Sequence, residues 1–255
     1  MPLNIPGILV PFQLLFSPRL VLPSLAVTDI RQLNFPALKR AGYRGAVFDK
    51  DNCLTIPHKD TLVPELETAW ESCRETFGEG NVLIVSNSAG TYLDAGSIQS
   101  ESVSYHLGVP VLAHKSFKPA YSCIDTVRRY FFSLPSPVQD HELIVVGDRI
   151  FTDVVMANRM RSQAMRRIAK ETMPGKTSAG DAIPPRGPLA IWTTGVWKRE
   201  SMLMRYMEST LVKAIRKSIS TPSETIDTTK FINPPDPEPP KKKGIFEKYK
   251  FSIFR

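Results

Sequence analysis

The sequence predicts an α/β fold organised as a doubly wound parallel sheet. Short apolar runs rich in Val, Ile and Leu alternate along the chain with stretches of helical length and periodicity. The runs are apolar throughout rather than at every second residue, which is typical of strands covered by helices on both faces. Polar side chains follow the ends of several runs, and parallel sheets bind their ligands at this edge.

The composition is that of a globular chain with a substantial core and a basic surface. Of 255 residues, 42% are hydrophobic, and 33 Lys and Arg against 25 Asp and Glu give a net charge of +8. Phosphate esters, nucleic acid and acidic membrane surfaces are all compatible with this charge. The three cysteines, an odd number without C-x-x-C spacing, argue against a zinc cluster or disulfide framework and favour a reducing compartment.

Residues 1–40 form an apolar N-terminal arm that prolines interrupt repeatedly. No uninterrupted apolar run of the roughly 20 residues needed to span a bilayer occurs there. The arm lacks the charged start of a secretory signal and is poor in Arg and Ser for a transit peptide. Two alternatives stay open: the arm packs on the core, or it lies in a membrane interface through its large apolar side chains. These side chains are Ile8, Leu9, Phe12, Leu14, Leu15 and Phe16.

Residues 41–218 contain the predicted sheet and its helices. The first buried strand covers 45–48, and the helix after it, over about 65–77, is opened by Pro64 and ended by Gly78. The following elements keep the same alternation of strand and helix. They are a strand at 81–85, a helix at 94–107, a short strand at 109–113, a helix at 120–132, a strand at 142–146 and a helix at 154–160.

A basic and then loop-like stretch, 161–188, is interpreted as an insertion that projects from the edge of the sheet opposite the acids. A last strand at 189–192 returns the chain to the site edge, and a helix over 197–218 starts there. This helix carries an apolar stripe flanked by Lys and Arg. It either docks on an anionic bilayer or covers the sheet with a solvated basic face, and we favour the second interpretation. The stripe is Leu203, Met207, Leu211 and Ile215.

Residues 219–255 are predicted to form a Pro-rich linker and a tail that mixes lysines with aromatic residues. Such a tail contacts lipid headgroups or nucleic acid, or has no fixed structure.

Polar groups suited to phosphoryl transfer follow four predicted strands. Asp49 and Asp51 come directly after the first strand, spaced so that an extended chain presents both on one side. Ser86 and Asn87 follow the second strand, Lys118 lies a few residues after the short third strand, and Asp148 and Asp153 follow the fourth. One carboxylate attacks phosphorus, and a second protonates the leaving oxygen and later takes a proton from water. A hydroxyl and an ammonium bind the oxygens of the transferred group.

The acids also predict a divalent cation at this edge of the sheet. Two neighbouring carboxylates without a cation would repel each other, and one pKa would rise. With Asp148, the pair completes an oxygen-ligand site for Mg²⁺, whose charge offsets that of the acids and the phosphate together. We therefore expect Asp49, Asp51 and Asp148 to hold Mg²⁺.

These motifs, in this order, resemble the haloacid dehalogenase superfamily of phosphatases. The resemblance rests on Asp49-Lys50-Asp51, Ser86, Lys118-Pro119 and Gly147-Asp148-Arg149-Ile150-Phe151-Thr152-Asp153 and covers about residues 45–160. It implies a Rossmann-like core and an aspartyl-phosphate intermediate on Asp49, with Asp51 as general acid and base. It also implies Mg²⁺ on Asp49, Asp148 and the backbone carbonyl of Asp51, with Asp153 in support.

The short connections between these motifs leave no room for a cap domain, so we expect a capless, open site. An open site suits a large or membrane-embedded phosphomonoester. The stretch Phe48-Asp49-Lys50-Asp51-Asn52-Cys53-Leu54-Thr55, with Pro57-His58, resembles the mitochondrial phosphatidylglycerophosphatase family of fungi and plants. The resemblance implies hydrolysis of phosphatidylglycerophosphate to phosphatidylglycerol, a step toward cardiolipin, at the matrix face of the mitochondrial inner membrane.

Further contacts and partners follow from this interpretation. Lys50, His58 and Lys59 border the acids and are candidates for contacts with the rest of the headgroup, although solvated loop positions would have the same sequence. We expect an anionic phospholipid partner, peripheral membrane association and no nucleic-acid partner. Two other functions stay open: a phosphatase of soluble phosphoesters or phosphoproteins, and a non-catalytic scaffold that binds membrane.

Overall fold

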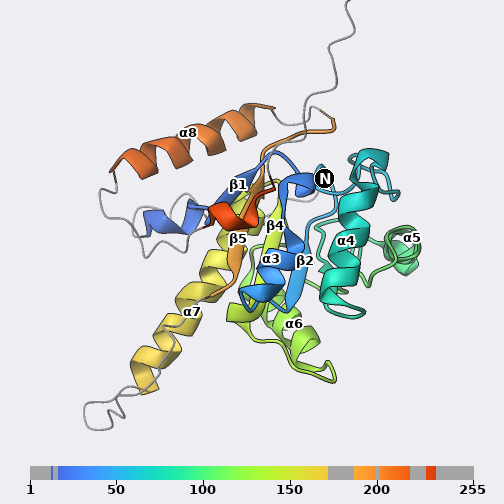
Figure 1. The fold of residues 1–255 in the computed structure, drawn as a ribbon, viewed down its shortest axis with the longest axis horizontal. Helices are drawn as coiled ribbons and strands as arrows, with labels where there is room; N and C mark the ends of the chain where they lie inside the picture. Colours follow the sequence, from blue (N-terminus) through green and yellow to red (C-terminus); the bar gives the residue numbers. More distant parts are fainter. Residues whose placement is uncertain (1–12, 14–16, 172–186, 199–201, 219–227, 234–255) are drawn as a thin grey trace, which may run out of the picture.

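The fold is a parallel sheet with helices on both faces (Figure 1). The computed structural model describes residues 13, 17–171, 187–198, 202–218 and 228–233. In this part of the chain a five-stranded sheet has the order β1-β5-β4-β2-β3, and every paired strand is parallel to its neighbour. The strands are β1 (Leu25–Val27), β2 (Gly45–Phe48), β3 (Val82–Ile84), β4 (Leu143–Gly147) and β5 (Leu189–Thr193). The predicted fold class is therefore confirmed.

The two faces of the sheet are covered by different helices, and each face has its own core. On one face α3, α4 and α5 bury Phe35, Trp70 and Val103 against side chains such as Phe48. On the other face α6 and α7 bury apolar residues against Val47 and its neighbours, together with Val212 of α8. The helices are α3 (Phe35–Arg40), α4 (Glu67–Phe77), α5 (Ile98–Leu107), α6 (Tyr121–Phe132), α7 (Val155–Glu171) and α8 (Met202–Ser218). Burial on both faces explains why the strands are apolar throughout.

The strand register brings the ends of β4, β2 and β3 together. Phe48 is level with Val146 on one side and with Ile84 on the other. The residues that follow these three strands therefore leave the sheet at the same edge. Because β2 lies between β4 and β3, the side chains that follow it have neighbours from both sides.

The short strand predicted at 109–113 is reduced to an isolated bridge between Val111 and Ile84. Pro110 has no N–H to donate, which prevents a longer ladder. The helix predicted from residue 94 begins as α5 at Ile98, after the 3₁₀ turn Ala95–Ser97. The carboxylate of Asp94 accepts hydrogen bonds from the backbone of Gly90, Gln99 and Ser100 and so fixes this entry. Between β2 and Lys118 the chain forms α4, β3, α5 and short 3₁₀ turns.

The described part of the N-terminal arm packs on the core. In addition to β1, it contains the 3₁₀ turns Pro18–Val21 and Ile30–Gln32 and the helix α3. The apolar side chains of residues 8–16 that we considered for the membrane interface lie outside the described residues. A C-terminal segment also returns to the core: the turn Thr229–Phe231 buries Phe231, whose ring centroid lies 6.0 Å from that of Tyr43. The other residues of 219–255 are not described.

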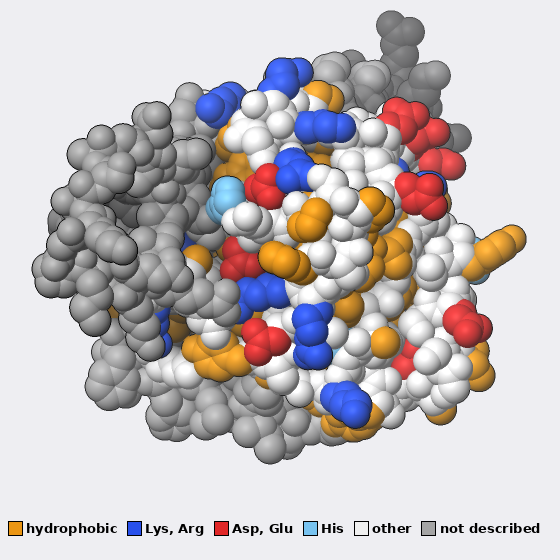
Figure 2. Space-filling model, turned by 90° about the horizontal axis from the view of Figure 1, so that it is seen from below, with side chains coloured by type: hydrophobic (Ala, Val, Ile, Leu, Met, Phe, Trp, Pro, Cys, Tyr) orange, Lys and Arg blue, Asp and Glu red, His pale blue; other side chains and the backbone are white. Residues whose placement is uncertain are grey.

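The helix predicted at 154–160 is longer than expected. A π-helical turn at Ile150–Val154 leads into α7, which continues to Glu171 and extends away from the sheet (Figure 1). Residues 172–186, the centre of the predicted insertion, lie outside the described residues. None of the described helices combines the length and apolar character needed to cross a bilayer. Seen from below, basic and acidic side chains are interspersed on the described surface (Figure 2).

Candidate active site

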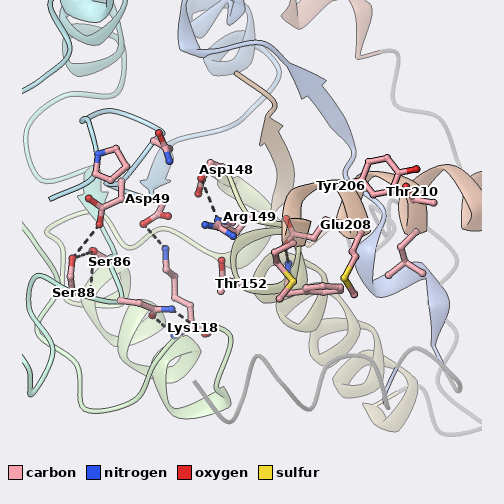
Figure 3. Close-up of a pocket in the computed structure, with 18 of the residues that line it drawn as sticks. Asp49, Ser86, Ser88, Lys118, Asp148, Arg149, Thr152, Tyr206, Glu208 and Thr210 are labelled. Carbon is pink, nitrogen blue, oxygen red and sulfur yellow. Dashed lines mark hydrogen bonds and ion pairs between the residues drawn. The ribbon is translucent and has the colours of Figure 1, made fainter. Parts of the chain in front are cut away.

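The site lies at the carboxyl edge of the sheet and is centred on the ammonium of Lys118 (Figure 3). Lys118 Nζ is 2.8 Å from Asp49 Oδ1 and 2.7 Å from Asp153 Oδ1. Burial alone would lower the pKa of this ammonium, but the charges of Asp153 and Asp49 outweigh burial and raise the pKa. Lys118 therefore stays positively charged. Its ammonium holds together Asp49, which follows β2, and Asp153, which follows β4.

Backbone contacts place Lys118 beside the end of β3. Its N–H donates to Asn87 Oδ1 at 2.7 Å, and Asn87 Nδ2 donates to the Lys118 carbonyl at 3.4 Å. The ring of His114 joins the same two connections, with Nε2 2.9 Å from the Ser86 carbonyl oxygen and Nδ1 2.7 Å from that of Ser116. Burial lowers the pKa of His114, and the hydrogen bonds with the Ser116 and Ser86 carbonyl groups oppose this shift. The histidine has no ligand spacing in the sequence, which is why its positioning role was missed.

Asp51 is held by three groups at the rim of the site. Its Oδ1 accepts from Lys50 Nζ at 2.8 Å and from the His58 backbone at 3.0 Å, and its Oδ2 accepts from Ser88 Oγ at 3.3 Å. Ser88 also contacts Ser86, because the two hydroxyl oxygens are 3.0 Å apart. The carboxylate thus has a fixed orientation beside a pair of hydroxyl groups.

Asp49, Asp148 and Asp153 form a cluster that could hold a metal ion. One carboxylate oxygen of each lies within 4.8 Å of the others. Burial raises the pKa of Asp148 well above its usual range, and the charges of Asp49 and Asp153 add to this despite Arg205 and Arg149. Burial also raises the pKa of Asp153, although Lys118 opposes the rise. Because burial is the main cause of both shifts, a bound divalent cation would favour the ionised form of these acids, and Mg²⁺ fits this set of oxygen ligands.

A glycine at the end of β4 allows Asp153 to approach the sheet. A Cβ atom added at Gly147 would lie 2.5 Å from Asp153 Cβ and still closer to its carboxylate. The carboxylate is also held by the Thr152 hydroxyl at 3.0 Å and by the Arg149 backbone at 3.2 Å. Gly147 thus leaves the space that Asp153 occupies, and Asp148 follows it directly at the end of β4.

Helix α8 contributes two buried charged groups that sequence reasoning did not assign to the site. Arg205 Nη2 forms an ion pair with Asp148 Oδ2, and Glu208 Oε1 accepts a hydrogen bond from the Phe151 backbone at 3.2 Å. Arg205 was expected on the solvated flank of the helix, and this expectation is wrong because Arg205 is buried against Asp148. Leu203 and Met207 of the predicted stripe are instead exposed, whereas Leu211 and Ile215 pack on the core.

The predicted headgroup residues differ in their placement. Lys50 is fully buried, and its ammonium binds Asp51 and the Lys59 carbonyl. It therefore holds the Asp51 carboxylate in place, and it is not open to a headgroup. Lys59 is exposed. His58 lines the same cavity as Asp49 and Asp51.

A cavity of about 1040 Å³ opens over the acids. Asp49, Asp51, Ser86, Lys118 and Asp148 line one part of it, as predicted for groups that act on one phosphorus atom. The other part is lined by α8, whose labelled Tyr206 and Thr210 lie on the far side of the cavity from Asp49 (Figure 3).

A parallel α/β sheet with acids, hydroxyl groups and an ammonium around a cavity at its carboxyl edge defines this protein as a phosphatase. More narrowly, the chain belongs to the mitochondrial PGP phosphatase family, whose sequence model matches residues 5–167. The match includes every predicted catalytic, phosphate-binding and metal residue and ends before α8.

Curated relatives occur in fungi, algae and plants. The mitochondrial phosphatidylglycerophosphatase of Saccharomyces cerevisiae is 38% identical over 160 residues, which are 63% of this chain and 84% of the yeast protein. The chloroplastic phosphatidylglycerophosphate phosphatase 1 of Chlamydomonas reinhardtii is 41% identical over 141 residues, 55% of this chain and 50% of that protein. The chloroplastic and mitochondrial enzyme of Arabidopsis thaliana is 38% identical over 159 residues, 62% of this chain and 44% of that protein. No solved structure matches the chain.

Proposed function

We propose that this protein is a Mg²⁺-dependent phosphatase that hydrolyses phosphatidylglycerophosphate to phosphatidylglycerol and phosphate through an aspartyl-phosphate on Asp49. The observation that carries the proposal is the convergence of Asp49, Asp51, Ser86 and Lys118 on one cavity. The relatives' names supply the substrate: three of them are named for phosphatidylglycerophosphate or its phosphatase activity.

In the first half of the proposed reaction, a carboxylate oxygen of Asp49 attacks phosphorus. Lys118 and the Ser86 hydroxyl bind the oxygens of the phosphoryl group as its charge shifts toward the leaving group. The bond from phosphorus to the lipid alcohol oxygen breaks, and Asp51 gives that oxygen its proton. Phosphatidylglycerol leaves, and the phosphoryl group stays on Asp49.

In the second half, Asp51 takes a proton from a water molecule. The water oxygen attacks phosphorus, the bond to Asp49 breaks, and phosphate is released. The contacts of Asp51 with Lys50, Ser88 and the His58 backbone keep its carboxylate at the rim of the cavity, where it can serve both steps.

Asp49, Asp148 and the Asp51 backbone carbonyl would hold Mg²⁺, with Asp153 in support. The bound ion would supply positive charge that offsets the acids and the phosphate. The raised pKa values of Asp148 and Asp153 support this assignment, because burial, together with the neighbouring carboxylates, disfavours their ionised forms and a bound cation would oppose both effects. The Lys118 ammonium contacts both Asp49 and Asp153 and so fixes the relative positions of these two carboxylates.

The proposed place of action is the mitochondrion, with peripheral association at the matrix face of the inner membrane. The yeast relative is named as mitochondrial, and the Arabidopsis relative as chloroplastic and mitochondrial. The net charge of +8 favours attraction to an anionic lipid surface.

The test compares phosphate release from phosphatidylglycerophosphate, phosphatidic acid and soluble phosphoesters with and without Mg²⁺. We expect phosphatidylglycerophosphate to be the preferred substrate and Asp49→Asn to lose at least about 10³-fold in kcat, because no nucleophile remains. Asp125→Asn is the matched control, since Asp125 on α6 is 57% exposed and lies outside the cavity. A preference for soluble esters would contradict the lipid substrate, and full activity of Asp49→Asn would contradict the mechanism.

A further inference from the structure

The first half of α8 exposes a row of large apolar side chains next to the active site. Met202, Leu203, Met204, Tyr206 and Met207 are all 42% exposed or more. Clusters of apolar side chains on a solvent-exposed protein surface mark a site for an apolar partner. Methionine is suited to a partner without fixed shape, because its unbranched side chain adapts to irregular surfaces.

Polar contacts fix this apolar row relative to the catalytic acids. Arg205 and Glu208 lie on the buried side of the same helical turns and bind Asp148 and the Phe151 backbone. Just before α8, the Lys198 N–H donates to Asn52 Oδ1 at 3.1 Å. The helix is thus attached to the connections that follow β2 and β4, and its exposed side is held at the entrance of the site.

The cavity joins the phosphate-binding residues to this helix. Met204, Met207, Leu211 and Ala214, spaced by three, four and three residues, form one helical stripe along its wall. Glu208 lies between the acids and the stripe, and its Oε2 is buried without a hydrogen-bond partner among the described residues. A ligand that matched this lining would have a phosphate at one end, polar groups near Glu208 and hydrocarbon at the other end.

We propose that the stripe Met204, Met207, Leu211 and Ala214 is the lipid wall of the active site. It binds the hydrocarbon part of the phospholipid substrate, while the exposed side chains around it enter the surface of the bilayer. The proposal rests on the proposed function and deepens it, since it assigns to α8 the discrimination between a membrane lipid and a soluble phosphomonoester.

The charge of α8 favours the same occupant. Lys213, Arg216 and Lys217 are exposed on the second half of the helix. A helix that combines apolar side chains with Lys and Arg is typical of binding to the interface of an anionic bilayer.

The experiment uses the full chain with Met204→Ser and Met207→Ser combined. We expect kcat/KM on phosphatidylglycerophosphate in phosphatidylcholine vesicles to fall about tenfold or more, because two apolar contacts with hydrocarbon are lost. Activity on glycerol 3-phosphate in solution should stay within about twofold of the unsubstituted protein. Flotation with vesicles of phosphatidylglycerol and phosphatidylcholine, without substrate, should show weaker binding of the variant.

The control combines Ile98→Ser and Tyr105→Ser on α5. These side chains are 72% and 85% exposed, lie seven residues apart on one helix, and do not line the cavity. We expect this variant to match the unsubstituted protein in all three assays. An equal loss in the control would overturn the proposal, because any exposed apolar pair would then have the same effect.

Three further outcomes would overturn it. A parallel loss on vesicles and on glycerol 3-phosphate would mean that the methionines only support the catalytic groups. A change of molar mass in light scattering, with unchanged vesicle activity, would show that the patch joins copies of this chain. Unchanged vesicle activity with lower thermal stability would show that another segment of the chain covers the patch. Flotation keeps this test separate from the proposed function, because it reports on α8 even if the substrate is another lipid.

Discussion

The space at Gly147 offers a sharp test of how the acids are held. In Gly147→Ala the new methyl group would lie 2.5 Å from Asp153 Cβ, so Asp153 must move. Asp153 is short and held by Lys118 at 2.7 Å, by Thr152 at 3.0 Å and by the Arg149 backbone at 3.2 Å. A shift therefore breaks a buried ion pair in addition to crowding the strand.

We expect Gly147→Ala to lower the free energy of unfolding by about 2–4 kcal/mol, from crowding and the weakened ion pair together. Lys118 would lose its ion pair with Asp153, and its ammonium would no longer be held beside Asp49. We therefore expect kcat/KM to fall about 100-fold, which corresponds to about 3 kcal/mol of transition-state stabilisation. Urea unfolding and phosphate release from phosphatidylglycerophosphate measure the two effects.

Gly42→Ala is the control for adding a methyl group to a glycine. Gly42 has φ +98° and no atom within 4 Å of an added Cβ, so its cost is that of the left-handed backbone, about 1–2 kcal/mol. Activity per folded molecule should not change. If Gly147→Ala keeps full stability and activity, the close packing of Asp153 against β4 does not position the site as we have argued.

Two further predictions concern metal binding and pH. Mg²⁺ at about 100 times its Kd should stabilise the protein by about 2.7 kcal/mol in thermal unfolding, and Asp148→Asn should remove most of this gain; an equal gain in the variant would place the ion elsewhere. Burial raises the pKa of Glu142, but hydrogen bonds from the Gln139 backbone and Arg44 and the charge of Arg44 outweigh burial and lower it. The contribution of ionised Glu142 to stability is therefore present above its unfolded-state pKa and is lost as the pH falls through its folded-state pKa. Glu142→Gln should cost about 1 kcal/mol in urea unfolding at pH 7, and this cost should decrease as the pH is lowered. A cost that is constant with pH would contradict this assignment.

The sequence predicted the strands β2, β3 and β4 and the order of the site residues well, for a physical reason. Strands buried on both faces must be apolar throughout, so β2, β3 and β4 stand out against their surroundings. The polar residues after them become neighbours because parallel strands end at one edge. Asp49 and Lys118 are 69 positions apart in the sequence, yet the fold brings them within 2.8 Å.

Other features depend on tertiary contacts that periodicity does not encode. β1 has three residues in a stretch rich in proline, and it is a strand because β5 offers it an edge. Arg205 lies among apolar and basic residues, and its burial follows from the charge of Asp148 rather than from the helical pattern. The roles of His114 and Asn87 likewise depend on backbone groups of a distant connection.

The most direct measurement is to trap the covalent intermediate. The protein is mixed with phosphatidylglycerophosphate carrying a ³²P-labelled terminal phosphate, quenched in acid within one turnover, and digested for peptide mapping. The account predicts label on the peptide that contains Asp49 and none in Asp49→Asn. Continued phosphate release without labelled protein, or with label on another residue, would contradict it.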